Sequence, residues 1–205
     1  MLSWLRVVTI AAMVTFSVGV AAQDQYQEGV HYDLIEPAIH TGISDRVVVT
    51  EFFSYGCGHC YNFEPLLESV ESRLPEGVVV QRTPEIWNNN PGMRLLANTY
   101  YAVEVLDVFE PVHGAVFNSI HRQRKRLSTP EAVRAVFVEN GVAEKDFDRA
   151  FGSFGLDSMV RQAGARTEGA RVQGTPSLMV NGKYRIDTRQ AGSQANMLKI
   201  AAFLA

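Results

Sequence analysis

The sequence predicts an α/β fold that is interrupted by a long helical insertion. A β-branched strand, a helix and a second strand follow one another over residues 46–83, and this order favours a parallel crossover unit. A tight hairpin and a closing helix occupy residues 176–204. Between these two parts, residues 91–165 show helical patterns and no good strand. A helical region is therefore expected to divide the α/β fold into two parts.

The first part of the α/β pattern begins with a polar segment, residues 23–44, in which we expect only a short edge strand. Residues 46–55 (RVVVTEFFSY) are β-branched and aromatic, which is typical of a buried strand. A Gly-Cys-Gly turn follows, and from His59 onward the apolar residues recur three and four apart, which indicates a helix. Residues 78–83 (VVVQRT) form the next predicted strand.

The helical insertion is predicted to contain several separate helices. Thr129 is a favourable N-cap, Pro130 suits the first helical position, and Gly141 ends that helix. The predicted helices of the insertion span residues 95–109, 112–121, 130–140 and 144–151.

The second part of the α/β pattern is a hairpin followed by a helix. Residues 176–180 (PSLMV) and 183–186 are its two strands, and Asn181-Gly182 between them is a strong signal for a tight turn. Residues 194–204 form the closing amphipathic helix.

Residues 1–22 have the pattern of a secretory signal peptide. A short start with Arg6 and no acid precedes an apolar run over residues 7–20, and small residues then lead to polar Gln23. We expect cleavage after Ala22 and export to an oxidising compartment, where cysteines normally pair. An uncleaved membrane anchor is the alternative, although the run is short for a span of about 20 residues.

The composition excludes several classes of protein. The chain has 205 residues, of which 46% are hydrophobic and 20% charged, and its formal net charge is −3. These values are typical of a soluble globular domain, alone or with a large insertion. A weakly acidic chain has no basic field that would attract nucleic acid. Two cysteines are too few for a disulfide scaffold or for a zinc site built mainly from thiolates.

Both cysteines lie in one C-x-x-C motif, Cys57-Gly58-His59-Cys60, at the predicted strand-to-helix junction. Cys57 is expected at the helix start, where unpaired N–H groups and the helix dipole favour an anion and lower the thiol pKa. Cys60 faces it one turn later, so the two cysteines can form a disulfide. Such a short loop gains little stability from a cross-link, which favours thiol–disulfide exchange instead. Cys57 would be the exposed nucleophile and Cys60 the shielded partner.

Three other roles of the motif stay open: a structural disulfide, half of a zinc site and a Cys–His hydrolase. A structural disulfide would stabilise almost nothing here, and a zinc site needs four ligands although no second cysteine pair exists. His59 is better placed to lower the pKa of Cys57, as a hydrogen-bond donor or a cation, than to act as a mobile base. A merely solvated histidine is the alternative. We therefore expect no metal and no soluble cofactor.

Residues 51–64 (EFFSYGCGHCYNFE) resemble the active-site segment of the DsbA family, periplasmic thiol:disulfide oxidoreductases with a thioredoxin fold. Gly174-Thr175-Pro176 matches the family's loop before a cis-proline, and the likeness extends over almost the whole mature chain. The resemblance implies a thioredoxin fold with an inserted α-helical domain. Residues 23–89 and 161–205 would form a discontinuous thioredoxin-like domain, and residues 90–160 the inserted helical domain.

The resemblance also implies a role for each matching residue. Cys57 corresponds to the nucleophile, Cys60 to its buried partner and His59 to the histidine that makes the pair oxidising. Pro176 corresponds to the cis-proline that faces the disulfide. Thr175 corresponds to the residue whose backbone pairs with a bound peptide.

Two further residues near the motif have expected roles. Glu51 is a carboxylate in an apolar strand, and such a group is costly unless it is hydrated or paired. The resemblance implies that Glu51 lies buried beneath the disulfide and aids proton transfer at Cys60; a solvent-facing edge position is the alternative. Gly58 stands where the family most often has proline. Because this dipeptide tunes the potential, the strength of the oxidant stays open.

The function implied by the resemblance is that of a periplasmic dithiol oxidase. It would donate the Cys57–Cys60 disulfide to reduced, newly translocated proteins and would be reoxidised by a quinone-linked DsbB-like membrane protein. We expect a monomer that binds no nucleic acid. A reductase or disulfide isomerase of the same fold is the nearest alternative, although no dimerisation domain is visible. A peptide-binding chaperone with incidental thiols is an alternative of a different class.

Overall fold

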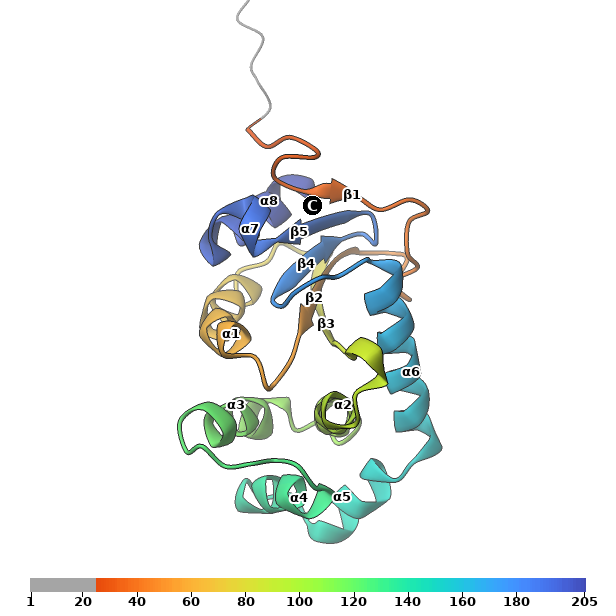
Figure 1. Ribbon diagram of the computed structural model, residues 1–205, viewed down its shortest axis with the longest axis vertical. Coiled ribbons are helices and arrows are strands. Elements are labelled where there is room, and N and C mark those ends of the chain that lie inside the picture. Colours follow the sequence, from red (N-terminus) through yellow and green to blue (C-terminus); the bar gives the residue numbers. More distant parts are fainter. Residues whose placement is uncertain (1–24) are drawn as a thin grey trace, which may run out of the picture.

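The computed structural model describes residues 25–205, so the predicted signal peptide, residues 1–22, lies outside the described residues. The described chain has a sheet with helices on both faces and a separate group of helices beyond one end of the sheet (Figure 1). No helix within residues 25–205 is both long and apolar enough to cross a membrane.

Within residues 25–205, five strands form one mixed sheet in the order β1-β5-β4-β2-β3. The central strand β2 (Val47–Phe53) pairs in parallel with β3 (Val78–Pro84) and antiparallel with β4 (Ser177–Val180). Strand β5 (Tyr184–Asp187) continues the sheet beside β4, and the short β1 (Asp33–Leu34) lies at its edge. The predicted crossover unit, hairpin and edge strand are all confirmed.

The turn between β4 and β5 has the geometry that its Asn-Gly sequence predicts. Asn181 and Gly182 both adopt positive φ angles, 51° and 68°. The Asn181 side chain accepts a hydrogen bond from the Val48 N–H at 3.0 Å, and the Gly182 carbonyl accepts one from the Ile39 N–H at 2.8 Å. A Cβ atom on Gly182 would lie 1.8 Å from the Ile39 carbonyl oxygen, so only glycine fits this turn.

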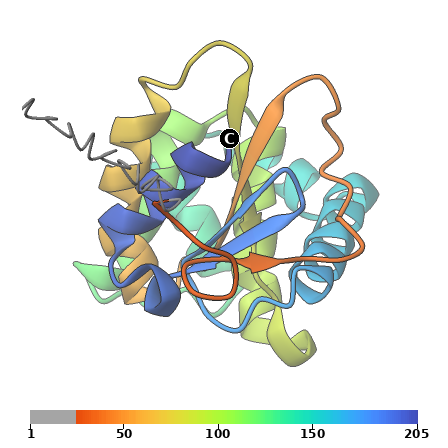
Figure 2. The ribbon, with the colours of Figure 1, turned by 90° about the horizontal axis from the view of Figure 1, so that it is seen from above.

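Helices cover both faces of the sheet. Helices α1 (Gly58–Glu71), α7 (Thr188–Ala191) and α8 (Gln194–Leu204) lie on one side, and α6 (Phe154–Gly169) lies on the other, as both views show (Figures 1 and 2). The apolar core on the first side contains Val49, Phe63, Leu67, Leu178, Val180, Ile186, Met197 and Ile200. The core on the second side contains Phe52, Ala170, Val172 and Met179.

The inserted helices pack on one another and on the end of β2. They are α2 (Pro91–Val105), α3 (Phe109–His121), α4 (Pro130–Glu139) and α5 (Glu144–Phe151). Their aromatic core also receives side chains from the end of β2 and the turn after it. Phe53 meets Tyr100 of α2 edge-on with ring centroids 5.1 Å apart, and Tyr55 meets Phe117 of α3 at 4.9 Å. The turn that carries the C-x-x-C motif is thereby fixed between the sheet and the inserted helices.

Helix α6 is the main element that the sequence prediction misses. It contains Gly155 and Gly169 near its ends and Gly164 in its interior, where glycine lowers helix propensity by about 1 kcal/mol relative to alanine. Tertiary packing of its buried face outweighs that cost, and Ser153 caps its first turn. The helix runs without interruption across residues 160 and 161, where the prediction places a domain boundary. The division into domains stays a prediction.

Helix α2 begins and ends earlier than the sequence prediction places it. It starts at Pro91 rather than at residue 95, because the Asn90 side chain caps it by accepting hydrogen bonds from the Gly92 and Met93 N–H groups. It ends at Val105, and the positive φ of Asp107 reverses the chain before α3.

Candidate active site

The C-x-x-C motif lies at the junction of β2 and α1, as the sequence predicts. Cys57 is the N-cap of α1, and its sulfur accepts a hydrogen bond from the Cys60 N–H at 3.4 Å. Cys57 is partly exposed, whereas Cys60 is fully buried one turn later. Both thiols are free in this structure, which therefore corresponds to the reduced form.

The two cysteines have opposite acidities. A hydrogen bond from the Cys60 thiol lowers the pKa of Cys57 from 9.0 to about 5, helped by the Thr175 side chain and the backbone N–H groups of Cys60 and His59. Partial burial of Cys57 opposes this shift. Burial raises the pKa of Cys60 far above its ordinary value, and the hydrogen bond between its thiol and Cys57 adds to the increase. At neutral pH, Cys57 is therefore a thiolate and Cys60 a thiol.

Thr175 lies beside the motif although it belongs to the other part of the chain. The Cys57 sulfur lies 3.4 Å from the Thr175 carbonyl oxygen, across 118 residues of sequence. The Thr175–Pro176 peptide bond is cis, as the family resemblance implies. A groove of about 510 Å³ runs past this contact and is lined by Ser54, Gly56, Cys57, Glu85, Trp87, Asn90, Gly92, Met93, Leu96, Leu127, Ser128 and Thr175.

Glu51 is fully buried in the central strand, which excludes the solvent-facing alternative. Neither of its carboxylate oxygens has a hydrogen-bond partner among the described residues. Its nearest cation is Arg82 on the neighbouring strand, with 3.7 Å between Arg82 Nε and Glu51 Oε2. Burial, followed by the charge of Glu64, raises the pKa of Glu51 well above its ordinary value. Burial therefore favours the protonated form of Glu51, which lies close to the buried cysteine.

Arg82 donates its hydrogen bonds to two carboxylates of α1 rather than to Glu51. Its Nη2 atom lies 2.7 Å from Glu64 Oε1 and 2.9 Å from Glu71 Oε2. Burial alone would raise the pKa of Glu64, but His113 and Arg82 outweigh burial and lower it. Arg82 is thereby bound to two carboxylates of α1 beneath the motif, and it helps to hold the pKa of Glu64 below its ordinary value.

Two histidines of α3 join the inserted helices to this buried cluster. His113 lies 3.3 Å from Glu64 Oε1 through Nε2 and 2.8 Å from the Tyr55 hydroxyl through Nδ1. His121 Nε2 lies 2.8 Å from the Tyr55 carbonyl oxygen. Sequence reasoning misses these residues, although a spacing of eight residues, about two helical turns, places both near one face of α3. Arg82 and Glu64 are also missed as site residues; each is a charge in an otherwise apolar pattern.

His59 and Gly58 occupy the exposed side of the motif. The His59 carbonyl accepts a hydrogen bond from Gln194 Nε2 of α8 at 2.7 Å, and its backbone N–H favours the Cys57 thiolate. A Cβ atom on Gly58 would meet nothing within 4 Å. The two residues between the cysteines thus leave the Cys57 sulfur open to an approaching partner.

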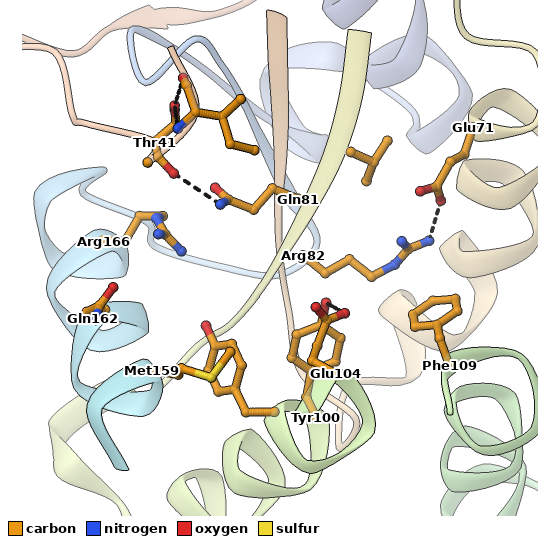
Figure 3. Close-up of a pocket in the computed structure, with 14 residues that line it drawn as sticks. Thr41, Glu71, Gln81, Arg82, Tyr100, Glu104, Phe109, Met159, Gln162 and Arg166 are labelled. Atoms are coloured by element: carbon orange, nitrogen blue, oxygen red, sulfur yellow. Dashed lines mark hydrogen bonds and ion pairs between the residues drawn. The ribbon is translucent and has the colours of Figure 1, made fainter. Parts of the chain in front are cut away.

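A second cavity lies away from the cysteines, between β3, α2 and α6 (Figure 3). It measures about 530 Å³, and its wall includes Arg82, Arg166, Tyr100 and Glu104. Arg82 extends along this wall to Glu71, and Arg166 Nη1 donates to the Thr83 hydroxyl at 2.9 Å. Among residues 25–205, no group of three or more histidine, cysteine and acidic side chains is placed to hold a metal ion.

Known proteins are similar to this chain in both sequence and fold. The family model of the DSBA-like thioredoxin domain matches residues 87–198. The thiol:disulfide interchange protein DsbA of Pseudomonas aeruginosa is 34% identical over 191 residues, which cover 91% of this chain and 88% of the relative. DsbA of Azotobacter vinelandii is 34% identical over 163 residues, covering 78% of this chain and 73% of the relative. The crystal structure of Pseudomonas aeruginosa DsbA has a TM-score of 0.84 at 31% identity, covering 88% of this chain and 93% of that chain.

These likenesses confirm the predicted DsbA-like thioredoxin fold and extend over most of the chain. They agree with the chemistry of the site, in which a thiolate at a helix N-terminus lies beside a buried thiol. The chain therefore belongs to the DsbA family of thiol:disulfide interchange proteins and is an oxidoreductase.

Proposed function

We propose that the protein is a periplasmic dithiol oxidase that donates its Cys57–Cys60 disulfide to reduced, newly translocated proteins. The main support is the low pKa of the Cys57 thiol, about 5. A protein whose reduced form is stabilised is a strong oxidant, because it gains free energy when it accepts electrons. The DsbA relatives are named thiol:disulfide interchange proteins, which agrees with thiol–disulfide exchange at this cysteine pair.

The reaction proceeds through two exchanges at sulfur. A substrate thiolate attacks the Cys57 sulfur, the Cys57–Cys60 bond breaks, and Cys60 leaves with the electron pair and takes up a proton. A second substrate thiolate then attacks the substrate sulfur of the mixed disulfide, and Cys57 leaves as a thiolate. The substrate loses two electrons and gains a disulfide, and the protein gains the two electrons as a thiolate and a thiol.

The residues around the cysteines have separate roles in this proposal. Glu51, which holds a proton in the buried strand, supplies a proton to Cys60 as it leaves. The low pKa of Cys57 makes it the better leaving group in the second exchange. Thr175, whose carbonyl lies beside the Cys57 sulfur, pairs through its backbone with an extended substrate peptide, and Pro176 keeps that carbonyl in place.

The cellular setting is part of the proposal. The signal peptide of residues 1–22 directs export to the periplasm, where the protein works as a monomer. A DsbB-like membrane protein reoxidises the cysteine pair, so that no soluble cofactor and no metal are needed. The alternatives of the same fold are a reductase and an isomerase, which need a lower potential or a dimer.

The reduction potential of the Cys57–Cys60 pair tests the direction of the reaction. The mature protein would be equilibrated in glutathione buffers and followed by the fluorescence of Trp87, which lines the same groove as Cys57. A potential above about −180 mV supports the oxidase, whereas a value near about −270 mV, in the thioredoxin range, would refute it. A Cys57→Ser variant should lose turnover in the oxidative refolding of a reduced disulfide protein. Full activity in that variant would favour a chaperone.

A further inference from the structure

Glu85 is a buried acid at the substrate side of the motif. It directly follows β3, and its N–H donates to the Phe53 carbonyl at 2.9 Å, which fixes it beside the end of β2. The side chain is only 2% exposed, yet it lines the groove together with Cys57 and Thr175. The position is therefore held by the sheet itself and opens toward the path of a substrate peptide.

Glu85 has no cation to neutralise it. Within residues 25–205 no ion pair reaches its carboxylate, and Oε2 has no hydrogen-bond partner. Its nearby polar groups are the Trp87 backbone N–H and the Cys57 sulfur, and Cys57 is the other titratable residue that lines the groove. Burial raises the pKa of Glu85 to about 7; the Trp87 N–H opposes this shift and the Cys57 charge adds to it. An unpaired acid of this kind in a cleft is a candidate for proton transfer.

The proposed function calls for a base near Cys57 that removes the proton of the substrate thiol. An ordinary cysteine thiol has a pKa of about 8.5, so only about 3% of it is thiolate at pH 7. Glu51 cannot accept the substrate proton, because it is fully buried beneath the motif and does not line the groove. Glu85 lines the same groove as Cys57, and a carboxylate whose pKa lies near the working pH is suited to general base catalysis.

We propose that Glu85 is a catalytic base that removes the proton of the substrate cysteine as its sulfur attacks Cys57, which rests on the oxidase function proposed above. The substrate S–H bond breaks, its proton passes to the Glu85 carboxylate, and the sulfur lone pair forms the bond to Cys57. The Cys57–Cys60 electron pair leaves with Cys60. Glu85 then releases the proton to water and serves the second substrate thiol in the same way.

Single-turnover reduction of the oxidised protein tests this role with two kinds of thiol. An alkyl thiol, such as a cysteine peptide, must lose its proton, whereas an aryl thiol such as thionitrobenzoate is already a thiolate at pH 7. Glu85→Gln should lower the ratio of the alkyl rate to the aryl rate by about tenfold to thirtyfold, since the 3% of free thiolate still reacts. Glu76→Gln, at the exposed loop before the same strand, is the matched control and should leave the ratio unchanged.

The pH profile provides a second readout that needs no variant. In the wild-type protein the alkyl rate should level off above about pH 7, where Glu85 is already ionised. In Glu85→Gln it should continue to rise tenfold per pH unit up to about pH 8.5, as the free thiol ionises. Three results in Glu85→Gln would refute the role of Glu85 as a base: an unchanged ratio of the alkyl to the aryl rate, an equal fall of both rates, or a rise of both rates. A low reduction potential in the wild-type protein would instead refute the oxidase, because the rate ratio is measured independently of it.

Discussion

Lowering the pH from 7 to 5 should remove most of the stability that the reduced protein draws from the Cys57 thiolate. The pKa of this thiol falls from 9.0 to about 5 on folding, so the folded state binds fewer protons than the unfolded state between these values. Stability from a lowered pKa is complete above the unfolded value and is lost as the pH falls through the folded value. The loss therefore extends from about pH 9 to about pH 5, and most of what remains at pH 7 is lost by pH 5.

The size of the effect follows from the two pKa values. At pH 7 the shift from 9.0 to about 5 corresponds to about 2.7 kcal/mol, and at pH 5 only about 0.4 kcal/mol remains. Because the disulfide form has no thiolate, the same free energy favours reduction. It raises the reduction potential by about 60 mV at pH 7. Partial exposure of Cys57 makes these figures upper bounds.

Urea unfolding of the reduced protein measures this loss. The free energy of unfolding would be determined at pH 7, 6 and 5 for the wild-type protein and for Cys57→Ala. The variant keeps the titrating carboxylates, so the difference between the two proteins isolates the thiolate. The ultraviolet absorbance of the thiolate, titrated in parallel, should show its midpoint near pH 5.

A difference between the two proteins that stays constant from pH 7 to pH 5 would refute this reasoning. A thiolate midpoint near pH 9 would refute it more directly, because the hydrogen bonds from Cys60, Thr175 and the helix N-terminus would then have no effect on the thiol. In that case the structure would give no reason to expect an oxidant.

Three further substitutions test other parts of the structure. Thr175→Val removes a hydrogen bond that favours the Cys57 thiolate, so the absorbance titration should give a pKa for Cys57 above about 5. An unchanged midpoint would exclude the Thr175 side chain as a cause of the low pKa. Arg82→Leu leaves the Glu64 carboxylate buried without its cation and should lower the free energy of unfolding at pH 7 by about 3–5 kcal/mol, and by less at pH 5. Wild-type stability in urea unfolding would contradict the buried ion pair of Arg82 with Glu64. Gly182→Ala should lower the free energy of unfolding by about 2–3 kcal/mol in the same assay, because the added Cβ would lie 1.8 Å from the Ile39 carbonyl oxygen at a φ of 68°. Wild-type stability of this variant would mean that the turn relaxes to accommodate the Cβ.

Features that depend on neighbouring residues could be predicted from the sequence. The β-branched run before the C-x-x-C motif and the apolar spacing after it place Cys57 at the start of α1, and the helix N-terminus then favours its thiolate. Asn181-Gly182 specifies its own turn, and Ser193 starts the closing helix at Gln194 as expected. Helix α6 was not predictable in this way, since its glycines oppose a helix that packing nevertheless stabilises.

The contacts that complete the site join distant segments. Thr175 lies 118 residues from Cys57, and the sequence alone associates the two only through the family resemblance. The ion pair of Arg82 with Glu64 and the contact of Tyr55 with His113 need the packing of β3 and α3 against α1 and the motif's turn.

By itself, the sequence determined the α/β pattern, the place of the reactive thiol and the class of chemistry, because helix ends, strand patterns and motif spacing act over a few residues. Only the tertiary structure decided which acid has its pKa raised beneath the motif, which has its pKa lowered beside Arg82, and which lies without an ion pair in the groove. The physical reason is that the pKa of a carboxyl is set by burial and by nearby charges. For Glu51, Glu64 and Glu85, those charges come from strands and helices that only the complete fold brings together.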